Sequence, residues 1–118
     1  MANQPIDLLD RPIAFHRCLA ELCDSVPAGL MLSQALYWDK RTTLDDGWFY
    51  KTAEEWKEET YLSPYEQRTA REKCKKYLLS ELRGIPAQLY YKVDRNSLNA
   101  DLLESPLKTS SEESSQLD

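Results

Sequence analysis

Two helix-start signals lie close together near the middle of this chain, and they constrain its fold more than any other feature. Residues 52–55 and 63–66 are both capping boxes, in which a hydroxyl accepts from the amide of a following glutamate and the glutamate reaches back. They predict a short helix over residues 53–60 and a longer helix from residue 64 to residue 77 or 78. Because only residues 61–63 separate them, the two helices must be joined by a tight turn.

The residues that follow alternate in polarity, which is typical of a strand. The apolar members are Leu89, Tyr91 and Val93, and the residues that alternate with them are Gln88, Tyr90 and Lys92. Leu82–Arg83 is the expected partner strand, residues 84–87 are the connection, and residues 48–50 form another short strand ahead of the helices. This order predicts a mostly α domain with a small β-hairpin wing, the winged helix-turn-helix.

The chain is expected to divide into a flexible arm over residues 1–10, a winged-helix domain over residues 11–104 and a disordered acidic, serine-rich tail over residues 105–118. Within the domain, Arg11 and Pro12 begin a predicted helix that ends near residues 23–25. A second helix over residues 27–40 is apolar on nearly every side, so it is expected to form the core, and a last short one covers residues 96–103. Side chains expected to point inward include Phe15, Trp38, Trp48, Ala53, Trp56, Ala70, Cys74, Tyr77, Leu78 and Tyr91.

The formal net charge is −5 at pH 7, but the charge is unevenly distributed. Residues 63–95 contain eight basic and four acidic side chains, a local balance of +4 that leaves −9 for the remainder. A basic region on an otherwise acidic body is typical of a nucleic-acid-binding surface. The second helix of the pair and the hairpin are therefore the expected contact surface for double-stranded DNA.

The basic residues fall on the predicted outward face of that second helix. Arg68, Arg71 and Lys75 are spaced i, i+3, i+7, and Gln67 lies near the helix start, where base-edge contacts are usual. Arginine suits guanine and glutamine suits adenine because each makes a bidentate contact in the major groove. Lys76, Arg83 and Lys92 are expected to contact phosphates. Tyr65 and Tyr90, which should be exposed near the same surface, complete the expected DNA-binding site. The alternative for such a face is a solvated, charged helix surface without a ligand.

No pattern of catalytic residues competes with this interpretation, so we expect a non-enzymatic protein without a metal or other cofactor. The three glycines form no phosphate loop, a single histidine does not build the usual zinc site, and the carboxylates of residues 54–59 indicate a solvated helix face. The three cysteines fit reduced side chains in apolar space. No apolar run is long enough for a membrane and no secretion signal is evident, so a cytoplasmic protein is expected.

Several segments of the chain also resemble a known family. They are residues 13–17 (IAFHR), 29–35 (GLMLSQA), 46–52 (DGWFYKT), 66–71 (EQRTAR) and 84–93 (GIPAQLYYKV). Together they are similar to the N-terminal winged-helix domain of phage and prophage replication-initiation proteins, which act as replisome organisers. The resemblance implies non-catalytic binding of origin or operator DNA by the second helix of the helix-turn-helix, in replication or transcription control.

A winged helix that binds a protein is the alternative, such as a phage-encoded inhibitor of a host protein. The acidic balance outside residues 63–95 and the acidic tail favour it. Its partner would be a second copy of the chain, a replication protein or a host protein.

Overall fold

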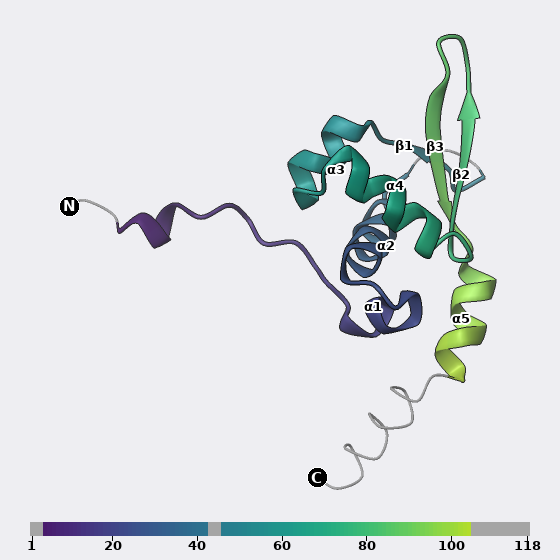
Figure 1. The fold of residues 1–118 in the computed structure, drawn as a ribbon, viewed down its shortest axis with the longest axis horizontal. Coiled ribbons are helices and arrows are strands. Elements are labelled where there is room, and N and C mark those ends of the chain that lie inside the picture. The colour runs from purple at the N-terminus through teal and green to yellow at the C-terminus, as the bar shows by residue number, and fades with distance from the viewer. Residues whose placement is uncertain (1–3, 43–45, 105–118) are drawn as a thin grey trace, which may run out of the picture.

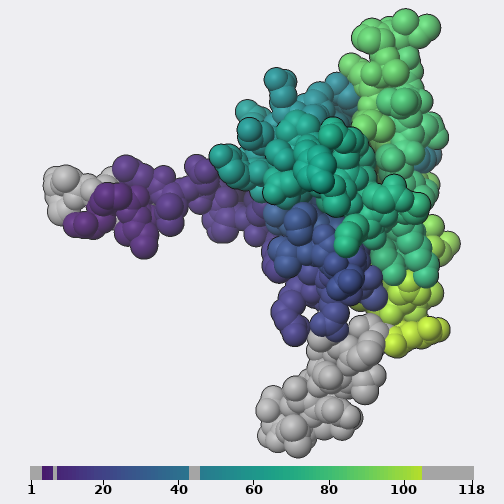
Figure 2. Space-filling model, in the orientation of Figure 1, coloured from purple at the N-terminus to yellow at the C-terminus, as the bar shows by residue number. Residues whose placement is uncertain are grey.

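A computed structural model describes residues 4–42 and 46–104 of the chain. Within these residues the domain combines five α-helices with a three-stranded antiparallel sheet. The helices form a compact body, and the hairpin of strands β2 (Leu78–Arg83) and β3 (Gln88–Val93) projects beyond it as a ridge (Figures 1 and 2). None of the helices in the described part is long and apolar enough to cross a membrane.

The helix α2 (Val26–Asp39) lies at the centre of the body, as predicted. The Ser25 hydroxyl caps it by accepting from the amide of Ala28 at 3.1 Å, and Met31 and Leu32 are completely buried. The helix α1 (Arg17–Cys23) packs so closely on α2 that a Cβ at Gly29 would lie 2.4 Å from the Cα of Ala20. Only glycine permits that approach.

The predicted start of the first helix, at Arg11 and Pro12, is wrong. The helix α1 begins at Arg17, and the amide of His16 just before it donates to the Ser33 hydroxyl of α2 at 2.9 Å. Residues 11–16 are exposed, and Phe15 is 45% exposed instead of pointing inward. Residues 10–14 line a pocket beside Gln34 and Trp38 of α2 without forming a helix, and a single isolated helical turn is unstable on its own. The short 3-10 helix η1 (Pro5–Leu8) lies further out along this arm, away from the body (Figure 1).

Both capping boxes form as predicted. The Thr52 hydroxyl accepts from the amide of Glu55 at 3.0 Å ahead of α3 (Ala53–Thr60), and the Ser63 hydroxyl accepts from the amide of Glu66 at 3.1 Å ahead of α4. The helix α4 (Pro64–Lys73) is shorter than predicted, because the chain turns at residues 74–77 and enters β2. Tyr77 and Leu78 are buried as expected, but by this turn and the first strand pair instead of by a helix face.

The sheet has the strand order β1-β3-β2, and β1 (Phe49–Tyr50) is its shortest strand. The strand β2 begins at Leu78, earlier than predicted, and pairs with β3 along its whole length. In β1 the inward aromatic side chain is Phe49, whose ring stacks on Tyr91 at 5.8 Å. Trp48 is only half-buried and Ala53 is exposed, so both were wrongly expected to point inward.

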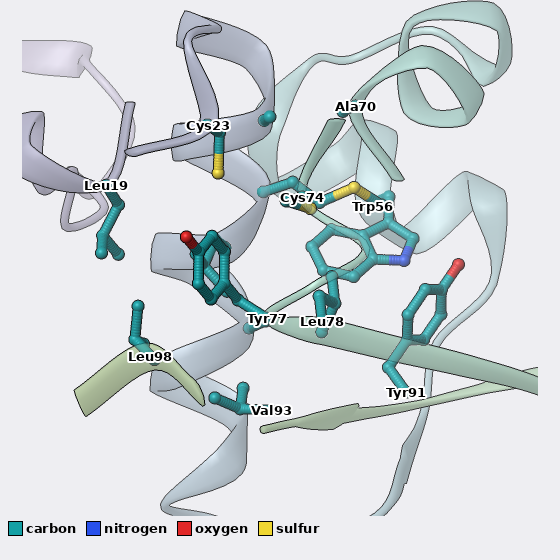
Figure 3. Close-up of a cluster of buried hydrophobic side chains, with 14 of the residues drawn as sticks. Leu19, Cys23, Trp56, Ala70, Cys74, Tyr77, Leu78, Tyr91, Val93 and Leu98 are labelled. Atoms are coloured by element: carbon teal, nitrogen blue, oxygen red, sulfur yellow. The ribbon is translucent and has the colours of Figure 1, made fainter. Parts of the chain in front are cut away.

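The core joins α1, α2, α4 and the sheet around Trp56 and Tyr91, whose rings meet edge to face at 5.3 Å (Figure 3). Two of the cysteines, Cys23 and Cys74, are buried free thiols of this core. The last helix, α5 (Arg95–Leu103), is capped by Asp94 as its first turn begins and adds Leu98 to the core. The predicted tail over residues 105–118 lies outside the described residues.

Candidate functional site

A groove of about 390 Å³ separates α4 from the β2–β3 hairpin. Pro64, Arg68 and Arg71 form its helical wall, and Leu82 and Leu89 belong to its hairpin wall. The groove exists because the hairpin packs on the domain only through its first strand pairs, so the outer half stands free of α4 (Figure 1). It brings together residues from two regions that the sequence predicted to share one surface.

Arg68 and Arg71 share the helical wall because residues three apart lie on the same side of a helix. Arg68 is exposed, and its guanidinium lies 5.7 Å from the ring centre of the exposed Tyr65. Arg71 is half-buried. Neither arginine forms an ion pair with any carboxylate of residues 4–42 and 46–104. Both positive charges therefore remain available to a ligand.

The Tyr91 side chain also lines the groove, and it keeps its proton. Burial raises the pKa of the Tyr91 hydroxyl, although the positive charge of Arg71 opposes the shift. Tyr91 is only 1% exposed, so the hydrogen-bond donors that the groove presents to solvent are the two guanidinium groups. A groove lined by such donors can hold an anion, and paired guanidinium groups are well suited to phosphate.

The structure places Gln67 inside the domain, so its predicted position on the outward face is wrong. It is 1% exposed, and its side-chain nitrogen donates to the carbonyl oxygens of Leu62 at 2.9 Å and of Ala53 at 3.0 Å. Gln67 therefore fastens α4 to the turn and to the start of α3. It has no free edge with which to contact a base.

The predicted lysines near the end of α4 lie beyond its last residue and are neutralised. The Lys75 ammonium pairs with Glu72 at 2.5 Å, and the Lys76 ammonium pairs with Asp101 of α5 at 2.8 Å. Asp101 also accepts from the Tyr77 hydroxyl at 2.6 Å, and burial, together with this hydrogen bond, raises the pKa of Tyr77 to about 12. These contacts of Asp101 with Lys76 and Tyr77 join α5 to the body of the domain.

Arg83, Tyr90 and Lys92 lie on the other face of the sheet. Successive side chains of a strand point to opposite faces, and Leu82, Leu89 and Tyr91 occupy the face that lines the groove. On the opposite face, the Arg83 guanidinium lies between the rings of Trp48 and Tyr90, at 4.9 Å and 4.8 Å from their centres. The predicted site thus divides into two groups that face different ways.

The groove-side face of the hairpin and its tip are uncharged, a feature that the sequence interpretation missed. Leu82 is 67% exposed and Ile85 is fully exposed, with a relative accessibility of 102%. The connection, residues 84–87, contains no charged residue, and this signal was visible in the sequence. The surface beside the arginines is therefore apolar.

Glu59 departs from the predicted solvated face of α3. Its carboxylate accepts from Lys51 at 2.5 Å, from Gln34 at 2.7 Å and from Trp38 at 2.8 Å. Burial opposes ionisation, but the hydrogen bonds outweigh it and lower the pKa of Glu59. This polar cluster ties α3 and the residue after β1 to α2. It thereby holds α3, the helix that precedes α4, in place on α2.

Comparison with protein families, with curated proteins and with solved structures finds no match to this chain. Among residues 4–42 and 46–104, no group of histidine, cysteine and acidic side chains is arranged to hold a metal ion.

Proposed function

We propose that this domain is a winged helix-turn-helix that binds double-stranded DNA without catalysis, with α3 and α4 as the helical pair and β2–β3 as the wing. The observation that carries the proposal is the pair Arg68 and Arg71, two cations without a carboxylate partner in the described residues, on the wall of the groove beside the hairpin. Duplex DNA presents closely spaced phosphates, and a protein gains affinity by neutralising them.

The exposed side of α4 suits the major groove. Tyr65, Arg68 and Thr69 project from its first turns, where a recognition helix contacts base edges. Arg68 can make the bidentate contact to guanine, and Arg71 lies deeper, where it suits a phosphate of the strand that passes over the groove. DNA recognition is thus assigned to the arginines of α4, whereas Gln67 stabilises the turn between α3 and α4.

The resemblance to phage replication initiators supports a role in replication or transcription control. In that role the domain would recognise a DNA site and leave the chemistry to other proteins. An acidic body with a small basic surface favours a limited contact, because regions away from that surface repel the phosphates.

Binding to a random-sequence duplex, measured by fluorescence anisotropy at two salt concentrations, tests the proposal. The variant Arg68→Ala/Arg71→Ala should bind at least about 10-fold more weakly and lower the log–log salt slope by about 0.9, since the phosphate contact assigned to Arg71 is lost. The matched control, Arg17→Ala/Lys40→Ala, removes two exposed cations elsewhere and should bind like the wild type. If no duplex binds at low salt, the proposal fails.

A protein-binding role is the second candidate, and the exposed arm favours it. Ile6, Leu8 and Leu9 are exposed by 70%, 70% and 74%, and such aliphatic side chains gain free energy when a partner covers them. Light scattering of the protein and of Leu8→Ser/Leu9→Ser would detect self-association through the arm. A monomer at all concentrations would exclude a homodimer held together in this way.

A further inference from the structure

We infer that the hairpin tip enters the minor groove of bound DNA as an apolar wedge, with Ile85 at its point and Leu82 on its flank. This inference rests on the proposed DNA binding, and it assigns the wing a contact that is not electrostatic. It follows from three features of the hairpin: the exposure of its apolar tip, the neutralisation of its nearest cation and its position beside α4.

The tip carries apolar side chains where a solvent-exposed turn would carry polar ones. Ile85 and Leu82 are both largely exposed, and Pro86 and Ala87 are exposed between the strands. Gly84 has a φ of +87°, a left-handed conformation that favours glycine, so the turn holds Ile85 outward at a defined position. Exposed aliphatic groups at the end of a projecting hairpin are typical of a surface that a partner covers.

The cation nearest the tip is already occupied. The Arg83 guanidinium pairs with Glu81 at 2.6 Å and lies 3.7 Å from Asp46, and these carboxylates raise the pKa of Arg83. Its side chain also points to the face away from the groove. A phosphate that bound there would compete with these two carboxylates for the Arg83 charge. The outer hairpin therefore offers the DNA its apolar face.

The position of the hairpin selects the minor groove. Leu82 and Arg68 line the same groove of the protein, so a duplex seated on α4 meets the hairpin beside it (Figure 1). When a recognition helix occupies the major groove, a neighbouring wing reaches the adjacent minor groove or backbone. Apolar side chains such as isoleucine and leucine enter the minor groove by wedging between base steps, which bends the duplex.

The experiment compares the wild-type protein with Ile85→Ser and with Leu103→Ser, which removes a 70% exposed aliphatic side chain from α5. Anisotropy gives Kd and the salt slope, and energy transfer between dyes on the two duplex ends gives the bend. Ile85→Ser should bind about 10-fold more weakly, because the apolar contact is lost, and bend the duplex less. Its salt slope should not change, because no phosphate contact is lost. Leu103→Ser should match the wild type in all three measurements.

A minor-groove ligand provides an independent test. A duplex with an A·T tract that is preloaded with a netropsin-type ligand should bind the wild-type protein more weakly and Ile85→Ser with little further loss. If Ile85→Ser keeps the wild-type affinity and bend, the inference is overturned, and the apolar tip is then a surface for a protein partner. Loss of binding by Arg68→Ala/Arg71→Ala in the same assay would then show that the proposed DNA binding stands without the wedge. If the wild-type protein binds no duplex, the proposed DNA binding and the hairpin wedge are both refuted.

Discussion

The polar cluster around Glu59 gives a stability prediction that can be worked from the structure. The Lys51 side chain is 5% exposed and the Glu59 side chain is 24% exposed, so the pair is largely removed from water. In Glu59→Gln the amide can still accept from a neighbouring donor, but the Lys51 ammonium loses its counter-charge. Breaking a buried ion pair at one partner costs about 3–5 kcal/mol, and the partial exposure of Glu59 places the expected cost nearer 2–3 kcal/mol.

Thermal unfolding followed by circular dichroism measures this loss. For a domain of this size, 2–3 kcal/mol corresponds to a midpoint lower by roughly 10–20 °C. The control is Glu58→Gln on the same helix, an exposed carboxylate without an ion-pair partner in the described residues. Its stability should stay within about 0.5 kcal/mol of the wild type. The double variant Lys51→Met/Glu59→Gln should recover part of the loss, because the uncompensated charge is gone.

The pH dependence of the free energy of unfolding is a second test of the Glu59 cluster. Because the folded state lowers the pKa of Glu59, the ionised carboxylate stabilises the fold fully above its unfolded pKa, about 4.3. That stabilisation is lost as the pH falls through the lower, folded pKa. The stability difference between wild type and Glu59→Gln should therefore be constant near neutrality and shrink below about pH 4. Equal stability of the two proteins at pH 7 would refute the assignment of the cluster as a stabilising ion pair.

Other variants test the core, the turn and the arm by the same unfolding measurement. Trp56→Ala removes a completely buried ring and should destabilise by about 3–5 kcal/mol, and wild-type melting would mean that Trp56 is exposed. Gln67→Ala should cost about 1–3 kcal/mol because the carbonyl groups of Leu62 and Ala53 lose their donor, whereas Thr69→Ala, at an exposed neighbouring position, should cost under about 0.5 kcal/mol. Deleting residues 1–9 should move the midpoint by less than about 2 °C, and a larger loss would show that the arm packs on the body.

The helix starts could be predicted because capping is local. Each capping box needs only a hydroxyl and a carboxylate within one turn, so residues 52–55 and 63–66 specify the starts of α3 and α4 without knowledge of the rest. The end of α4 could not be predicted in this way. Residues 74–78 have no glycine or proline, and the helix ends because Leu78 pairs with Val93, a partner far along the chain.

The burial of Gln67 was predictable from the helical period. Gln67, Ala70 and Cys74 are spaced i, i+3, i+7, and the last two were expected to point inward. Polarity alone suggested an outward glutamine. A polar side chain can occupy such a stripe when backbone carbonyl groups accept its hydrogen bonds, and a tight turn between two helices supplies them. The position of a residue in the period is thus a better guide here than its chemistry.

The hairpin shows why exposure does not determine which ligand a side chain can meet. The alternation along β3 correctly separates Tyr91 from Tyr90 and Lys92, but the outer face of a sheet and the outer face of α4 point in different directions. Only the packing of the hairpin beside α4 determines which strand face borders the arginines. That face carries Leu82 and Leu89, so the arginines that line the groove lie on α4 and the leucines that line it lie on the hairpin. A duplex held by both would owe its salt dependence to α4 and its bend to the hairpin tip.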